Sequence, residues 1–127
     1  MPRRRPPRPV DRRGVVTNAS PVDRNTFLEQ SSRTLERLER GLGALEHEAL
    51  DVQLSGDVLT LAFDDGARYV INAHSAAGQI WMAAERNAWH FDYVEDRAVW
   101  IAAKTGDELL ATVERLVAKK LDTAVRL

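Results

Sequence analysis

The feature that most constrains this chain is a run of short alternating segments between two longer amphipathic ones. Between residues 50 and 102, stretches of four to six residues alternate side chains in the way that a β-strand with one buried face does. Turn-forming residues such as Ser55-Gly56-Asp57 and Asp64-Asp65-Gly66 separate the stretches and favour an antiparallel meander. The expected strands are residues 50–54, 58–63, 68–72, 79–83, 89–92 and 99–102.

Two amphipathic helices are expected to frame these strands. Thr26 with Glu29, and Thr105 with Glu108, have the spacing of a capping box at a helix start. Apolar or small residues then recur every three or four positions, as one face of a helix requires. They are Leu28, Ser31, Leu35, Leu38, Leu42 and Leu45 in the first helix, and Leu109, Leu110, Val113, Leu116, Val117 and Leu121 in the second. This order predicts an α+β, two-layer sandwich: an antiparallel sheet of about six strands with both helices on one face.

Composition excludes several classes of protein. The chain has 127 residues and no Cys, which rules out disulfides, a thiolate nucleophile and cysteine-ligated zinc or iron–sulfur clusters. No P-loop, G-x-S-x-G or H-E-x-x-H motif is present. No apolar run approaches the ~20 residues that span a bilayer, so no membrane association is expected. We therefore expect a domain without recognisable catalytic machinery.

Charge is distributed unevenly along the chain. Residues 1–28 carry seven Arg and two acidic residues, and residues 29–65 carry nine acidic residues and three Arg, net charges of +5 and −6. Residues 1–22 are rich in Arg and Pro, and we expect a disordered extension there and one folded domain over residues 23–127. Two interpretations of the extension stay open: an electrostatic arm for nucleic acid or an acidic protein, and a solvated tail without a partner.

Strand alternation assigns several side chains to the face of the sheet away from the helices. If Ile80 and Met82 face the helices, Gln79 and Trp81 face solvent. The same reasoning turns His90 and Asp92 outward, and also Trp100. An exposed Trp beside polar residues is typical of an anchor for a protein partner. The alternative is that Trp81 packs against loops at the sheet rim and contributes to stability alone.

Six segments of the chain resemble the frataxin family, and within it the bacterial CyaY type. They are Val58–Leu61, Tyr69–Asn72, Gln79–Ala83, Trp89–Tyr93, Val99–Ile101 and Thr105-Gly106. The similarity covers about residues 25–121, and its most specific part is Ile71-Asn72 followed by Gln79-Ile80-Trp81. The resemblance implies the same sheet with two helices on one side.

The resemblance also implies a function. Frataxins bind the cysteine desulfurase and the scaffold protein on which iron–sulfur clusters are assembled, and they modulate that assembly. It implies that the exposed sheet face makes these contacts, through the equivalents of Asn72, Gln79 and Trp81, and alternation adds His90 and Trp100 to the predicted partner-binding residues.

Iron binding along an acidic ridge on the first helix and first strand is the second implication. Shallow carboxylates bind Fe²⁺ and Fe³⁺ weakly and exchangeably. In an extended segment Glu46 and Glu48 would share one side, with His47 opposite. The candidate ligands are Glu36, Glu39, Glu46, His47, Glu48 and Asp51.

This ridge departs from the family pattern. No acidic residue occurs at 41–45, and Arg33, Arg37 and Arg40 interrupt the helix. Glu29–Arg33 and Glu36–Arg40 have the spacing of ion pairs on a solvated helix, which is the alternative interpretation of these charges.

The sequence as a whole predicts a monomeric, non-enzymatic, iron-binding regulator of iron–sulfur cluster assembly. The bacterial cytoplasm is the expected compartment, with the mitochondrion as the alternative, and no nucleic-acid partner is expected. Two other hypotheses stay open: an adaptor of the same machinery that does not bind iron, and an assembled, iron-driven oligomer with iron-oxidase activity.

Overall fold

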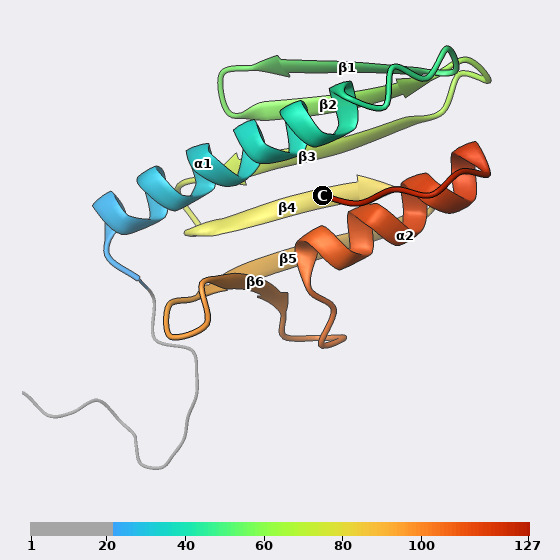
Figure 1. The fold of residues 1–127 in the computed structure, drawn as a ribbon. Coiled ribbons are helices and arrows are strands. Elements are labelled where there is room, and N and C mark those ends of the chain that lie inside the picture. The colour runs from blue at the N-terminus through green and yellow to red at the C-terminus, as the bar shows by residue number, and fades with distance from the viewer. Residues whose placement is uncertain (1–21) are drawn as a thin grey trace, which may run out of the picture.

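A computed structural model describes residues 22–127 as two layers, with two helices packed on one face of a six-stranded sheet (Figure 1). The strands pair antiparallel with their neighbours in chain order, β1 to β6. This confirms the predicted α+β sandwich. The elements are α1 Arg24–Gly43, β1 Leu50–Ser55, β2 Val58–Phe63, β3 Arg68–His74, β4 Gln79–Ala84, β5 Asn87–Val94, β6 Val99–Ala102 and α2 Leu109–Leu121.

Helix α1 begins earlier than its predicted capping box. Asp23 is the N-cap, and its carboxylate accepts hydrogen bonds from the Thr26 backbone N–H at 2.9 Å and the Thr26 hydroxyl at 3.1 Å. The predicted box at Thr26 is therefore wrong, because an Asp three residues upstream satisfies the same free N–H groups. Phe27 lies in the core, whereas Leu28 is 42% exposed, so the prediction that Leu28 lies on the buried face is wrong. The buried face of α1 begins one residue earlier and consists of Phe27, Ser31, Leu35, Leu38 and Leu42, at spacings of three and four.

Helix α2 is capped by Glu108, not by Thr105. The Glu108 carboxylate accepts from the backbone N–H groups of Leu110 and Ala111, both at 2.9 Å. Thr105 instead donates its hydroxyl to Asp107 Oδ2 at 2.9 Å, because the loop before the helix turns back on itself. The predicted apolar face is confirmed: Leu109, Val113 and Val117 are fully buried, and Leu110, Leu116 and Leu121 pack half-buried against the core.

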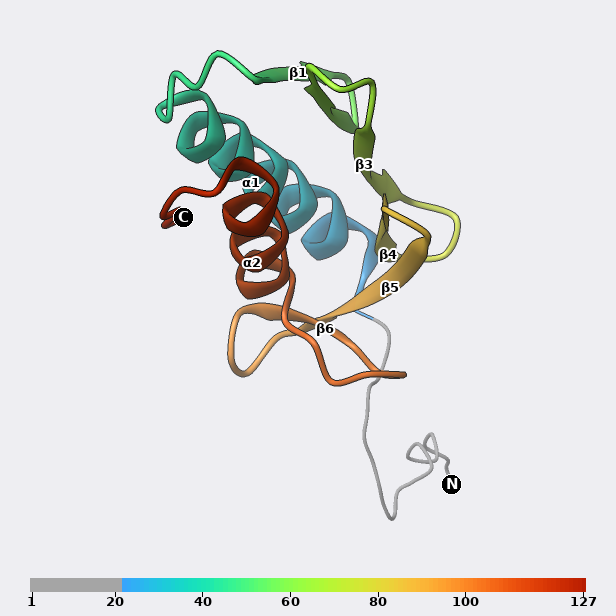
Figure 2. The same ribbon diagram turned by 90° about the vertical axis from the view of Figure 1, so that its right-hand side faces the viewer.

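The two helices and the sheet face each other as two layers (Figure 2). The core between them consists of side chains from both helices and of inward side chains from all six strands. Strands β2 to β5 alternate buried and less buried residues as predicted. Strand β6 does not follow the prediction: Trp100 is 3% exposed and faces α1, so the expected outward orientation is wrong. All four residues of β6 are apolar, so only its register with β5, in which Trp100 pairs with Tyr93, decides the orientation.

The segment after α2 closes the helical layer. It runs back between the two helices (Figure 1), with Val125 8% exposed in the core. The Leu127 N–H donates to Glu114 on α2 at 2.7 Å, and its carbonyl accepts from Arg37 on α1 at 3.1 Å. These contacts hold α1 and α2 at a fixed separation over the sheet.

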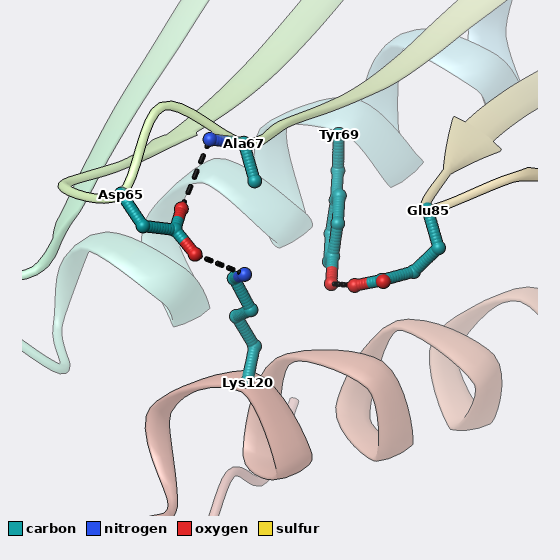
Figure 3. A network of polar contacts seen from close by, with 5 residues as sticks. All are labelled: Asp65, Ala67, Tyr69, Glu85 and Lys120. Atoms are coloured by element: carbon teal, nitrogen blue, oxygen red, sulfur yellow. Dashed lines mark hydrogen bonds and ion pairs between the residues drawn. The ribbon is translucent and has the colours of Figure 1, made fainter.

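Polar contacts join α2 to the turn after β2, and β3 to the turn after β4 (Figure 3). Lys120 on α2 pairs with Asp65 at 2.5 Å, and Asp65 also accepts from the Ala67 N–H at 2.9 Å. These interactions hold the pKa of Asp65 below its usual value and raise the pKa of Lys120. Beside them, the Tyr69 hydroxyl donates to the Glu85 carboxylate, and burial together with that carboxylate raises the pKa of Tyr69.

Within residues 22–127, neither helix is long and apolar enough to cross a bilayer. The predicted extension over residues 1–22 lies outside the described residues except for Val22, which packs against the core.

Candidate functional site

The face of the sheet that the helices leave bare carries a group of aromatic and polar side chains on β3, β4 and β5. Asn72, Trp81 and His90 stand opposite one another in a single row across the three strands. His74 pairs with Gln79 one row away. The predicted outward orientation of Gln79, Trp81 and His90 is confirmed, since their inward neighbours Ile80, Met82 and Phe91 are buried.

Two imidazoles sandwich the indole of Trp81. The His74 and Trp81 rings stack with centroids 3.9 Å apart and planes 23° apart, and the Trp81 and His90 rings with centroids 4.4 Å apart and planes 21° apart. Offset stacking of this kind contributes roughly 0.5–1.5 kcal/mol per pair. We call these three residues the aromatic stack. It fixes the indole of Trp81 in one orientation on an otherwise open surface.

A chain of hydrogen bonds fixes the same indole in its own plane. Trp81 Nε1–H donates to Gln79 Oε1 at 2.8 Å, and Gln79 Nε2–H donates to Asp92 Oδ1 at 3.0 Å. The polar atom of Trp81 is thus already satisfied within the protein. A partner that covers this surface meets an indole edge whose orientation and hydrogen bonding are set beforehand, which lowers the entropy cost of docking.

The sequence prediction of this surface was incomplete in two ways. Trp100 is not part of it, because its indole faces α1 and donates to Thr34 Oγ1 at 3.0 Å. His74 belongs to it and was missed, because the third strand was expected to end at Asn72. Extending the alternation by two residues would have placed His74 on the same face as Asn72.

The predicted acidic ridge is divided among three elements. Glu36 and Glu39 lie on α1, Glu46, His47 and Glu48 in the connection to β1, and Asp51 on the bare face of β1. Among residues 22–127, no three His, Asp or Glu side chains are grouped closely enough to hold a metal ion.

The connection from α1 to β1 is a pair of turns and not the extended segment expected. Glu46 has a φ of +47°, in the left-handed region, so Glu46 and Glu48 do not project as neighbours along a strand. His47 Nδ1 accepts a hydrogen bond from the Ala49 N–H at 3.1 Å. This hydrogen bond occupies the Nδ1 lone pair, so Nε2 is the His47 nitrogen that is left for another partner.

The arginines between these acids partly neutralise α1. Glu29 and Arg33 form the predicted pair at 3.8 Å, with both side chains more than 60% exposed. In the part of the chain that the structure describes, Glu36 and Arg40 are not within ion-pair distance. The Glu36 carboxylate is therefore not engaged by the arginine one turn further along the helix.

Comparison with known proteins identifies the family. The sequence pattern of the frataxin-like domain matches residues 20–123 of this chain. The chain belongs to the frataxin-like family. The predicted resemblance is thereby confirmed, and the match extends over both helices and all six strands.

Relatives with known names or structures agree with this assignment. The iron–sulfur cluster assembly protein CyaY of Thioalkalivibrio sulfidiphilus is 35% identical over 103 residues, which are 80% of this chain and 96% of that protein. Frataxin from Psychromonas ingrahamii has the same fold, with a TM-score of 0.74 at 24% identity, over 82% of this chain and 96% of that one. Trimeric yeast frataxin, solved in complex with ferrous iron, gives a TM-score of 0.55 at 24% identity, over 86% of this chain and 94% of that one.

Proposed function

We propose that this frataxin-like protein takes part in iron–sulfur cluster assembly as a non-enzymatic component. In this proposal it binds the cysteine desulfurase and its scaffold protein through the bare face of the sheet. Relatives named as iron–sulfur cluster assembly proteins support a role in that assembly, and their bacterial origin supports a cytoplasmic location. The observation that carries the docking surface is the aromatic stack around Trp81.

The stack has the properties of a binding hot spot. Trp is among the side chains that dominate interface energies, and rigid aromatic anchors lose little conformational entropy when they dock. Trp81 is half-buried by its neighbours and still reaches the surface, with Asn72 and Val70 beside it on β3. The three central strands β3 to β5 hold these positions rigid, which a loop would not.

The docking proposal is tested by measuring the affinity of the desulfurase–scaffold complex for the protein. Trp81→Ala is expected to weaken binding at least about tenfold, as the loss of a hot-spot residue does. Gln53→Ala is the matched control, because Gln53 is exposed on the same face but on the edge strand β1, away from the stack. Equal affinities of the Trp81→Ala variant and the unmutated protein would overturn the proposal.

We propose in addition that iron binds weakly as cargo along the acidic ridge. The net charge of −6 over residues 29–65 attracts a cation to this edge. Glu46, Glu48 and Asp51 are all exposed and lie within six residues of one another in the chain. Carboxylates are suitable ligands for iron, and the absence of a preformed cage among the described residues suits release as well as binding.

Titration with Fe²⁺ under anaerobic conditions tests this second proposal by paramagnetic broadening of amide signals. The amides of Glu46, Glu48 and Asp51 are expected to broaden first, while those of Glu95 and Asp96 in the β5–β6 turn remain sharp. A variant with Glu46→Gln, Glu48→Gln and Asp51→Asn should lose the effect. Equal broadening at the ridge and at the β5–β6 turn, or no broadening at either, would contradict the iron site. The protein would then act as an adaptor that does not bind iron.

A further inference from the structure

A groove lies along the flank of α1 at the end of the molecule where that helix begins. Its walls are the first half of α1, the β1–β2 turn and the β3–β4 turn, which come together at the same end of the sheet (Figure 1). The volume of the groove is about 140 Å³. Pockets that hold drug-sized ligands are larger, about 300–1,000 Å³, so this groove fits a few side chains better than a small molecule.

The lining of the groove is apolar at its base and acidic at its rim. Phe27, Leu35 and Leu54 contribute apolar surface, and Leu28 stands at the edge. Within residues 22–127, Leu28 is the large hydrophobic side chain that remains exposed, at 42%. The charged residues of the lining, Glu36 and Asp57, are both acidic. A complementary occupant therefore combines apolar side chains with positive charge.

Residues 1–21, outside the described part of the chain, combine apolar side chains with positive charge, and they join the domain beside the start of α1. Residues 1–21 contain six Arg and one Asp, and they include the apolar pair Val15-Val16. The domain begins at Val22, which packs against the core immediately before α1. Six residues reach about 20 Å when extended, and the groove follows α1 over the ten residues from Phe27 to Glu36, about 14 Å, so Val16 is within reach.

We propose that residues 1–21 dock intramolecularly in this groove. Val15-Val16 cover Leu28 and the apolar base, and the neighbouring arginines meet Glu36 and Asp57. The net charge of +5 in residues 1–21 complements the net charge of −6 in residues 29–65. Docking in this position covers Glu36, the end of the acidic ridge nearest the start of α1.

A spin label placed on the full-length chain tests the docking directly. The protein has no Cys, so Asn18→Cys provides a single attachment site for a nitroxide. Docking predicts strong paramagnetic broadening of the Gly56 and Ser75 amides on the far walls of the groove. The amides of Glu95 and Asp96 are the matched reference, because their turn lies at the same end of the sheet and is also acidic (Figure 1).

Two perturbations separate docking from the effect of a tether alone. Reversing the groove charges with Glu36→Lys and Asp57→Lys is expected to reduce the broadening at Gly56 and Ser75 severalfold, whereas Glu95→Lys with Asp96→Lys leaves it unchanged. In the spin-labelled protein without charge reversal, 1 M salt should also weaken the broadening at Gly56 and Ser75, because the screening length is then about 3 Å. This measurement stays valid even if the reversed-charge variant folds poorly.

Three results would overturn the proposal. Equal broadening at the groove and at the β5–β6 turn would show a tail without a preferred site, and insensitivity to both charge reversal and salt would exclude the proposed contacts. Broadening of unlabelled, ¹⁵N-enriched protein by labelled protein in a mixed sample would show that a second copy fills the groove. The experiment involves neither iron nor the desulfurase, so its outcome is independent of the proposed function.

Discussion

The two faces of the sheet hold tryptophan in different ways. On the covered face, Trp100 and Trp89 are 3% and 8% exposed, and each indole N–H donates to a partner beyond the sheet, Thr34 on α1 and Asp107 before α2. On the bare face, Trp81 is only half-buried, and its contacts come from the sheet itself: His74 and His90 on the neighbouring strands and Gln79 on its own strand. The same residue type thus joins the two layers on one face and forms a surface feature on the other.

This difference indicates which contacts the fold depends on. Removal of a side chain from between the layers leaves a cavity that the helices cannot fill, because protein interiors are close-packed. A side chain on the bare face leaves only solvent behind when it is removed. A large aromatic residue at this position, with its N–H satisfied and both ring faces covered, is consistent with the partner surface proposed above.

The largest effect on stability is expected from Trp100→Ala. This variant removes the edge contact with Phe27, whose ring centroid lies 5.8 Å away, and the hydrogen bond to Thr34. Substitution of a buried Trp by Ala costs about 3–5 kcal/mol in the free energy of unfolding. Urea denaturation measures this loss, and Trp100→Phe, which keeps most of the ring volume, is the control. A loss below about 1 kcal/mol would contradict the inward orientation of Trp100.

A smaller effect on stability is expected from Trp81→Ala, the corresponding substitution on the bare face. The variant loses two stacking contacts, and we expect a decrease of about 1–3 kcal/mol in the free energy of unfolding. His74→Ala and His90→Ala should each cost about half as much, because each removes one of the two contacts. Losses as large as that of Trp100→Ala would mean that the bare face is required for folding, and the contrast between the faces would fail.

Trp89→Phe is expected to cost less again. It retains the buried ring and removes only the hydrogen bond from Nε1 to Asp107 Oδ2, 3.0 Å long. One such bond contributes about 0.5–1.5 kcal/mol. The same urea measurement tests it. An unchanged free energy of unfolding would show that this bond does not join the loop before α2 to the sheet.

Much of the fold could be predicted from the sequence because periodicity and turn chemistry agreed along most of the chain. The alternation in β2 to β5 and the three- and four-residue spacing in both helices each specify a buried face. The errors lie where that signal is weak. In β6 all four residues are apolar, and at each helix start two residues capable of capping lie within three positions of each other, so tertiary context decided between them.

The candidate site was less predictable, because it depends on pairing between strands. The outward position of Trp81 follows from alternation within β4, but the His74–Trp81 contact requires the register between β3 and β4. The acidic ridge was predicted from charge along the chain. Charge does not reveal that the connection after α1 turns at Glu46, or that the His47 ring binds the backbone of Ala49.

The smallest expected effect concerns the pH dependence of the layer contact made by Trp89. Hydrogen bonds from the Thr105 hydroxyl and the Trp89 indole hold the pKa of Asp107 below its usual value of 3.8. A carboxyl with a lowered pKa in the folded state stabilises the fold fully above pH 3.8, and this contribution is lost as the pH falls below that value. Asp107→Asn should therefore be less stable than the unmutated protein at neutral pH, by an amount that shrinks at lower pH.

Urea denaturation near pH 6 and near pH 2.5 measures this change, because the stabilisation by the ionised carboxyl is fully present at the first value and is lost progressively as the pH falls below 3.8. Asp96→Asn in the exposed β5–β6 turn is the control, with a difference from the unmutated protein that is small at both pH values. A constant difference for Asp107→Asn would mean that ionised Asp107 is not what holds Trp89 at the layer boundary. The contact of that indole with the loop before α2 would then be one of packing alone.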